Sequence, residues 1–474
     1  MPRRGDIALA ANRRFDWRIV ATTIVLILAL GAAIFLNVRK TSEQSVDVGN
    51  SITVDDGDEK INWDRLENYN TVLSDSLTIT QAGVYHLTGE IADGLIVVDA
   101  GVNDVKLILD NVTINNNSGP AISCYSADTL VIELTGENTL SDGERYGSEY
   151  DIDVNGAIYS KADLVFQGDG TLRLTSNYQD AIVGKDDVKF VSGEYIISAK
   201  DDAVRGKDSV YIKGGDFVIN AKADGIKSTN ETDMDKGFVL IENGNLEISA
   251  ADDGIKASRE LRIDDSVINV VKSYEGLEGQ IVAINGGNIK INSNDDGINA
   301  GNSSSTSKTD ANCVISINAG DIYVNASGDG IDSNGYIYFN GGKVVVDGPT
   351  NNGNGPLDSG LGITINGGNV LVVGSNGMPE TLGNTSTVNN IGVFFTEKLS
   401  AGTVIEIKDS QGNEVLSHTS AKSFSYLAAG NSEFILGDTY TIYINGEKYQ
   451  DFIISDVTTM VGNNKNVFNN GFRR

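Results

Sequence analysis

The chain has 474 residues, with 54 glycines, only 5 prolines and a net charge of −29. This charge argues against nucleic-acid binding and against adsorption to an anionic membrane surface. Cys124 and Cys313, the only cysteines, are expected to be free and mostly buried, which excludes a disulfide scaffold. His86 and His418, the only histidines, lie in no recognisable motif, which argues against histidine-based catalysis.

The N-terminus predicts a membrane anchor. Five arginines in residues 1–18 precede an apolar stretch at 19–38, which is long enough to cross a bilayer. Because more positive charge lies before this stretch than after it, we expect residues 1–18 to be a cytoplasmic tail. The chain is then an uncleaved, single-pass protein of the cell membrane with its C-terminal bulk extracellular. A cleaved signal peptide is the alternative, and it also places the bulk outside the cytoplasm.

Residues 39–74 are polar and acidic, and we interpret them as a linker and N-terminal cap that contains Trp63. Short alternating strand patterns begin after residue 75. A longer acidic and aromatic loop, 142–153, interrupts them and is either a binding surface or a plain mobile loop.

A short acidic box recurs down the middle of the chain, and its acids lie 22, 22, 29, 22, 21 and 33 residues apart. Polar inserts account for the two long intervals, so the underlying period is about 22 residues, which is typical of a solenoid. The boxes are Gln179-Asp180-Ala181-Ile182, Asp201-Asp202-Ala203-Val204, Ala223-Asp224-Gly225-Ile226, Asp252-Asp253-Gly254-Ile255, Tyr274-Glu275-Gly276-Leu277, Asp295-Asp296-Gly297-Ile298 and Gly328-Asp329-Gly330-Ile331.

Each repeat also contains two alternating runs joined by a Gly-Gly corner, as at Gly214-Gly215 and Gly341-Gly342. Three short strands and three corners per 22 residues predict an all-β protein whose residues 75–375 form a right-handed parallel β-helix. The aliphatic residue of each box should point inward and hold successive coils together. A hairpin meander is the structural alternative, but it does not keep one residue type at one place in every repeat.

After a Gly/Ser/Asn-rich link, residues 389–456 alternate again and are punctuated by turns such as Asn445-Gly446. We predict a small antiparallel β domain there, packed on the end of the β-helix. The Asn-rich remainder, 457–474, is predicted to be disordered.

Stacked coils place the acids of the boxes in a column. Like charges about 5 Å apart repel by roughly 1 kcal/mol even in water, and Ca²⁺ binds six to eight oxygens and can bridge neighbouring coils. We therefore predict calcium there, although the acids can instead cap the corners by accepting N–H bonds from the Gly-Ile turn that follows each acid. The predicted ligands are Asp180, Asp201, Asp202, Asp224, Asp252, Asp253, Glu275, Asp295, Asp296 and Asp329.

Three residues after each acid comes an outward column that includes Arg205, Lys227 and Lys256. These cations either pair with the neighbouring carboxylates or form a strip that meets acidic sugars. Since Trp63 is the only tryptophan outside the apolar N-terminal region, Tyr146, Tyr150, Tyr159 and Tyr274 are possible sugar platforms. Of these, Tyr146 and Tyr150 in the long loop are the predicted binding residues. The full outward column is Val183, Arg205, Lys227, Lys256, Glu278, Asn299 and Asp332.

Several stretches together resemble the bacterial carbohydrate-binding domain-containing β-helix family. They are Ile79-Thr80-Gln81-Ala82-Gly83-Val84-Tyr85, Gly94-Leu95-Ile96-Val97-Val98-Asp99-Ala100, Gly136-Glu137-Asn138-Thr139-Leu140-Ser141-Asp142-Gly143 and the Asp-Asp-Gly-Ile boxes. The resemblance implies a fold similar to that of calcium-dependent pectate lyases, binding of cellulose-type or acidic glycans such as polygalacturonate, and calcium in the doubled acidic turns. That last implication is weaker where the box departs from the pattern, at Gln179, Ala223, Tyr274 and Gly328.

Three functions remain open. The first is a monomeric cell-surface protein that binds polysaccharide with the help of calcium and without turnover. The second is a calcium-dependent lyase that uses Lys227 or Lys256 as its base, although a carboxylate column raises a lysine pKa unless bound calcium outweighs it. The third is a structural or adhesive rod.

Overall fold

The structure is a computed structural model that describes residue 52, residues 57–302 and residues 307–462. Within these ranges the regular structure consists of β-strands and two short 3-10 helices, η1 (Gly57–Lys60) and η2 (Trp63–Arg65). The predicted membrane segment, 19–38, lies outside the described residues. In the part of the chain that is described, no helix is long and apolar enough to cross a membrane.

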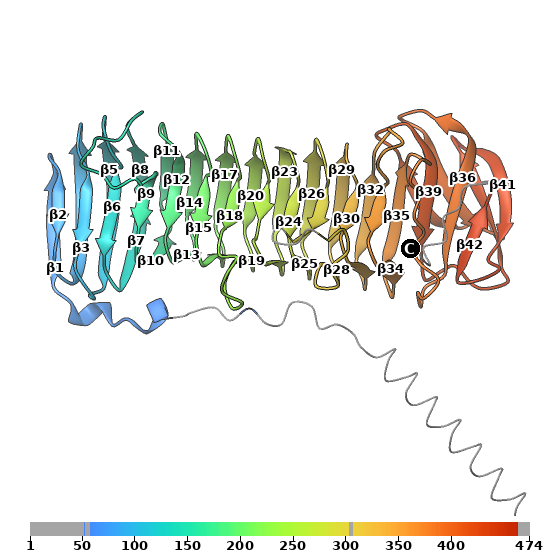
Figure 1. The fold of residues 1–474 in the computed structure, drawn as a ribbon, viewed down its shortest axis with the longest axis horizontal. Coiled ribbons are helices and arrows are strands. Elements are labelled where there is room, and N and C mark those ends of the chain that lie inside the picture. The colour runs from blue at the N-terminus through green and yellow to red at the C-terminus, as the bar shows by residue number, and fades with distance from the viewer. Residues whose placement is uncertain (1–51, 53–56, 303–306, 463–474) are drawn as a thin grey trace, which may run out of the picture. The chain divides into compact units, whose positions relative to one another are not determined.

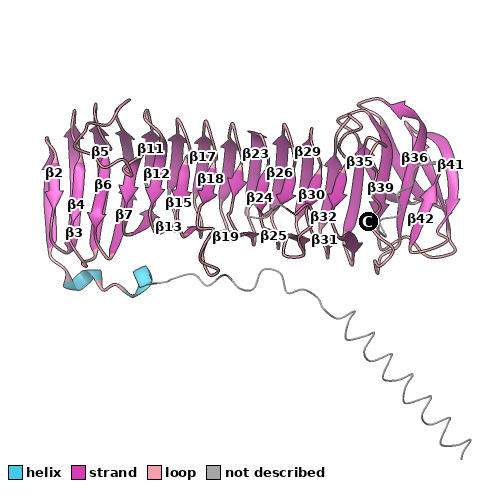
Figure 2. Cartoon of the chain, in the orientation of Figure 1, coloured by secondary structure: helices cyan, strands magenta, loops and turns pink. Residues whose placement is uncertain are grey.

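The strands up to β35 form three parallel ladders, in which each strand pairs with its counterpart one coil further along the chain (Figures 1 and 2). The first ladder contains β1 (Asn68–Leu73), β3 (Gly83–Ile91), β5 (Val105–Asn115), β7 (Thr129–Thr135), β10 (Asp163–Gly168), β13 (Asp187–Phe190), β16 (Ser209–Ile212), β19 (Phe238–Ile241), β22 (Glu260–Ile263), β25 (Ile281–Ile284), β28 (Val314–Ile317), β31 (Tyr336–Phe339) and β34 (Gly362–Ile365). The second starts in the later halves of β3 and β5 and continues through β8 (Glu137–Ser141), β11 (Thr171–Thr175), β14 (Glu194–Ser198), β17 (Asp216–Asn220), β20 (Asn245–Ser249), β23 (Val267–Ser273), β26 (Asn288–Ser293), β29 (Asp321–Ala326), β32 (Lys343–Asp347) and β35 (Asn369–Gly374). The third contains β2 (Leu77–Ile79), β4 (Ile96–Asp99), β6 (Ile122–Ser126), β9 (Gly156–Ser160), β12 (Asp180–Gly184), β15 (Val204–Gly206), β18 (Ile226–Ser228), β21 (Ile255–Lys256), β24 (Leu277–Gly279), β27 (Ile298–Ala300), β30 (Ile331–Ser333) and β33 (Leu357–Ser359).

The third ladder confirms that the box is the repeating unit. Its aliphatic residues pair coil to coil, and each has no exposed surface, so they form an inward row of the core. The row consists of Ile182, Val204, Ile226, Ile255, Leu277, Ile298 and Ile331, and it continues to Leu357. The all-β class and the parallel, β-helix-like stacking are therefore as predicted.

The Gly-Gly corners are explained by backbone geometry. The second glycine of each corner has a positive φ, for example 118° at Gly215 and 75° at Gly342. Side chains other than glycine rarely adopt this region, so these residues allow the sharp change of direction between the first and second ladders.

The glycine of the later boxes has a different role, which is to let neighbouring coils approach closely. A Cβ added at Gly276 would lie 2.3 Å from the carbonyl oxygen of Gly297 and 2.3 Å from Ile291 Cγ2. The two most N-terminal boxes carry alanine at this position, Ala181 and Ala203, so the approach required there is less close.

We therefore expect Gly276→Ala to lower the free energy of unfolding by about 1–3 kcal/mol through overpacking. Gly301→Ala is the control, since the nearest atom to its added Cβ is 3.7 Å away. Urea unfolding monitored by circular dichroism compares the two variants. Equal midpoints would contradict the close-approach explanation.

The C-terminal part closes the end of the ladders. The strands β37 (Val404–Asp409), β38 (Glu414–Thr419), β40 (Thr439–Ile444) and β41 (Glu447–Ile453) form an antiparallel sheet with its own core. The strand β39 (Phe424–Gly430) instead pairs antiparallel with both β35 and β36 (Asn390–Leu399), so it covers the last edge of the second ladder. An antiparallel sheet is therefore present within the predicted range 389–456, and β36 and β39 of the same range continue the large sheet.

One further strand lies inside the segment predicted to be disordered, 457–474. It is β42 (Thr458–Val461), which pairs parallel with β36 through Thr458 and Asn390. The Asn-rich composition predicted disorder, but Thr458 and Thr459 at the start of this segment favour a strand and pair with the edge of β36. The residues from 463 onward lie outside the described ranges.

Candidate acidic site on the third ladder

The acids of the boxes lie at the corner that leads into the third ladder, and their carboxylates are linked from coil to coil. The backbone N–H of Asp202 donates to Asp180 Oδ1 at 3.1 Å, that of Asp224 to Asp202 Oδ1 at 3.0 Å, and that of Asp253 to Asp224 Oδ1 at 2.9 Å. The same bond joins Asp329 to Asp296. The carboxylates of Asp180, Asp202, Asp224 and Asp296 therefore each satisfy one donor of the next coil.

This pattern differs from the corner cap considered in the sequence, in which the donor was the turn that follows each acid. The donor is instead the next acid's own backbone, which lies one coil away. Such a bond uses one carboxylate oxygen and leaves the second to face the outward row. Asp180, Asp224 and Asp253 are at most 2% exposed, so the second oxygen requires a partner.

In the N-terminal coils, that partner is a basic side chain of the outward row. Arg205 contacts Asp180 Oδ2, the Lys227 ammonium lies 2.6 Å from Asp224 Oδ2, and the Lys256 ammonium lies 2.7 Å from Asp253 Oδ2. Lys227 is also 3.8 Å from Asp202, and Lys256 contacts Glu278. The three cations predicted to form a sugar strip therefore pair with the acids of the column.

In the C-terminal coils, the outward row changes character, because its residues are Glu278, Asn299, Asp332 and Asp358. Asn299 donates to Glu275 at 2.9 Å, but no lysine or arginine follows Lys256 in this row. Carboxylate oxygens of Asp296, Asp329 and Asp332 all lie within 4.8 Å of one another. Asp332 was placed in the outward column by its spacing but was not predicted as a ligand.

Raised pKa values occur in both parts of the column, since burial raises the pKa of Asp202 to about 6 and that of Asp253 to about 7. Burial raises the pKa of Asp296 to about 7, that of Asp329 to about 6 and that of Asp332 to about 8, with the neighbouring carboxylates adding to the effect. Burial also raises the pKa of Glu275 to about 7. These carboxyl groups resist ionisation near neutral pH unless a cation joins them.

An asparagine ladder at another corner shows how stacked polar side chains avoid this problem. Asn318 Nδ2 donates to Asn285 Oδ1 at 2.7 Å, Asn340 to Asn318 at 2.8 Å, and Asn366 to Asn340 at 2.9 Å. An amide both donates and accepts, so such a ladder is neutral and complete. A carboxylate only accepts when ionised, so the acidic column needs protons or cations.

The doubled acids bring further carboxylates to the column. Asp201 joins Asp180 and Asp202, and Asp252 joins Asp224 and Asp253, each trio having ligand atoms within 4.8 Å. Asp201 and Asp252 are exposed, and Asp295 is half-buried beside Tyr274, whose pKa it raises to about 12. The geometry thus brings the carboxylates predicted as metal ligands into such trios, with the exception of Asp295.

The two tyrosines predicted to bind sugar form part of a packed aromatic cluster. The Tyr146 ring stacks on Tyr178 with centroids 4.4 Å apart, and its hydroxyl donates to Asp142 at 2.8 Å. The Tyr150 ring centroid lies 5.7 Å from that of Tyr146, and both rings pack against a buried cluster of Val154, Tyr159 and Val183. These contacts hold the long loop against the third ladder, and they leave the two rings half-buried.

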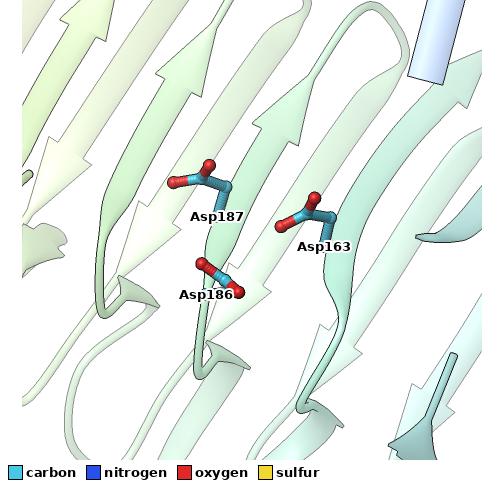
Figure 3. Close-up of side chains that lie close together, drawn as sticks. All are labelled: Asp163, Asp186 and Asp187. Atoms are coloured by element: carbon cyan, nitrogen blue, oxygen red, sulfur yellow. The ribbon is translucent and has the colours of Figure 1, made fainter. Parts of the chain in front are cut away.

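A second acidic cluster lies elsewhere, on the first ladder, and was not predicted. Figure 3 shows Asp163 on β10 beside Asp187 on β13 and Asp186 in the turn before it. Ser209 donates to Asp187 at 2.6 Å, and Lys236 lies 3.9 Å from Asp186. The Asp186-Asp187 doublet was the available sequence signal, but it lies outside the box.

A family model and a sequence relative agree on one family. The model of the carbohydrate-binding domain-containing family matches residues 74–313 and 275–443. A carbohydrate-binding domain-containing protein of Acetivibrio thermocellus is 34% identical over 187 residues, which is 38% of this chain and 64% of that protein, so the chain spans less than two thirds of this relative. A solved structure, described as a polysaccharide lyase-like protein from C. thermocellum in a gadolinium derivative, is 30% identical and matches with a TM-score of 0.41 over 48% of this chain and 94% of that one. The chain belongs to the carbohydrate-binding domain-containing family.

Proposed function

We propose that this chain is a membrane-anchored, extracellular protein that binds polysaccharide with the help of calcium and without turnover. The observation that carries the proposal is the family match, which spans residues 74–443 and therefore the whole acidic column. The parallel ladders are then the three sides of a closed, right-handed β-helix, and residues 19–38 anchor it with the bulk of the chain outside the cell.

Calcium belongs, in this proposal, mainly to the C-terminal coils of the column. The acids from Asp180 to Asp253 already have Arg205, Lys227 and Lys256 as counter-ions. The trio of Asp296, Asp329 and Asp332 has three carboxylates within 4.8 Å and no basic residue in its row. Since calcium takes six to eight oxygens, such a trio leaves coordination positions for water or for a sugar carboxylate.

The basic and acidic parts of the row suggest how an acidic glycan would be held. Arg205, Lys227 and Lys256 are each partly exposed, with side-chain exposures of 23%, 28% and 32%. They can therefore contact uronate carboxylates while they keep their partners in the column. Calcium in the later coils would contribute a second set of contacts to the same polymer.

The lyase alternative is less well supported, because it requires a neutral lysine. Burial works to lower the pKa of Lys227 and Lys256, but their carboxylate partners outweigh it and raise both pKa values above the ordinary range. A lysine held in its charged form is a poor general base.

The proposal is tested by pull-down with insoluble polygalacturonate and cellulose, in calcium and in EGTA. We expect retention on polygalacturonate in calcium and about tenfold weaker retention for Lys227→Ala, in line with the loss of one charge-assisted contact. Lys343→Ala is the matched control, because Lys343 is an exposed lysine on the second ladder. If the protein is retained on neither polymer, polysaccharide binding is refuted. If unsaturated uronate is released from polygalacturonate, the protein is a lyase and not a binding protein without turnover.

A further inference from the structure

One row of outward-facing side chains on the first ladder is buried as deeply as the core. Val131, Val165, Lys189, Tyr211 and Leu240 are in register on successive strands from β7 to β19. Each is at most 4% exposed, although each alternates with residues that point into the core. Further along the same row, the small residues Ala283 and Ser316 are also buried, whereas the larger Arg262 and Tyr338 are only half-buried.

The segment before β1 contacts this row. The Asp58 carboxylate in η1 lies 2.8 Å from the Lys189 ammonium, and Glu59 lies 2.7 Å from the ammonium of Lys213. In η2, the Trp63 ring lies 4.8 Å beneath the Lys106 ammonium, on the strand that precedes β7 in the ladder. In Figure 1 the blue segment runs from β1 along the edge of the stacked strands, which agrees with these contacts.

The pair of Asp58 and Lys189 is the most buried of these contacts, with side-chain exposures of 11% and 5%. Lys189 also lies 5.5 Å from the Tyr211 ring. A lysine on an outward row would ordinarily keep its ammonium in water. Its burial is therefore a consequence of the segment that covers it, and removal of one partner would leave a charge in a poorly solvated site.

We propose that residues 57–66, here called the strap, are an intramolecular clamp that joins the first coils to the coils around β13 and β16. In a stacked-repeat protein each coil contacts only its neighbours, so the terminal coils open most easily. The strap contacts Lys106 on β5, Lys189 on β13 and Lys213 after β16, and so it connects coils that are not neighbours in the stack. It also places its own N-terminal end, at Asp58 and Glu59, beside β13 and β16 and not beside β1.

Hydrogen exchange measured by mass spectrometry on the full chain tests the clamp. Asp58→Asn and Lys189→Met, which keep side-chain volume, should each speed exchange in β5 to β16 by about tenfold or more. The double variant should be no faster than the faster single variant, because both substitutions break the same pair. Exchange in β31 and β34, which the strap does not contact, should stay within about twofold.

The matched controls are Asp321→Asn and Lys343→Met, an ion pair of 4.0 Å on the second ladder in which both side chains are 60% exposed. These should leave exchange unchanged everywhere. Unchanged exchange in β5 to β16 for the strap variants would overturn the proposal. So would equal acceleration along all coils, because the effect would then be a general loss of stability and not a local clamp.

Discussion

Replacement of Asp347 by alanine should lower the free energy of unfolding by about 3–5 kcal/mol and undock the C-terminal domain. The Asp347 carboxylate has no exposed surface at the end of β32. It accepts hydrogen bonds from Tyr323 at 2.8 Å and Ser420 at 2.9 Å, and it lies 3.0 Å from His418 Nε2. These partners come from both the stacked strands and the C-terminal domain, so one carboxylate joins the two parts.

Thermal unfolding and limited proteolysis measure this effect. Asp347→Ala should unfold in two steps and be cleaved between β35 and β36, whereas the wild-type chain should unfold in one step and resist cleavage. Burial acts to raise the pKa of Asp347, but its hydrogen bonds outweigh this effect and lower the pKa overall. The hydrogen bond with His418 makes the largest lowering contribution. The stabilisation should therefore be present above the ordinary aspartate pKa and be lost as the pH falls below it. A single transition of unchanged midpoint in the variant would refute this role.

Chelation of calcium should make stability depend strongly on pH. The pKa values of Asp296, Asp329 and Asp332 are raised, to about 7, about 6 and about 8. A raised acid pKa means that ionisation opposes folding, so the free energy of unfolding should fall by roughly 3 kcal/mol or more as the pH rises from 4 to 8. Calcium should restore it, by about 2.7 kcal/mol at a hundredfold excess over its dissociation constant.

Urea unfolding at pH 5 and pH 8, in EGTA and in calcium, measures this linkage. Asp332→Asn removes one of the carboxylates, so in EGTA it should be more stable than the wild type at pH 8 and should gain less from calcium. Asp321→Asn is the control, since this exposed residue should alter neither response. Stability that is independent of both pH and calcium would exclude a cation site in these coils.

The period, the core row and the corners could be predicted from the sequence because each depends on a residue type repeated at a fixed place. Ile255 and Leu277, for example, are both buried because each is the aliphatic residue of its box and points into the core. The asparagine and acidic ladders follow from the same stacking. Their different requirements for cations could also be recognised from the chemistry of the side chains.

The parts that could not be predicted depend on contacts distant in sequence. Nothing near Asp58 indicates Lys189, and nothing near Asp347 indicates His418 or Ser420, since these pairs form only when the whole stack is built. The packing of Tyr146 on Tyr178 is also a contact between residues distant in sequence. Because the sequence does not indicate this contact, the aromatic loop was interpreted as a sugar platform. Pairing of Lys227 and Lys256 with the column was one of two interpretations of their spacing, and the structure shows these ion pairs.

Isothermal titration with calcium at pH 7.5 tests most directly whether the acidic column is a calcium site. We expect wild-type protein to bind calcium, Asp332→Asn to lose at least one ion, and Asp180→Asn to bind as the wild type does, because Arg205 already serves as the counter-ion of Asp180. Absence of calcium binding in the wild type, or loss of binding only in Asp180→Asn, would contradict a site in the C-terminal coils.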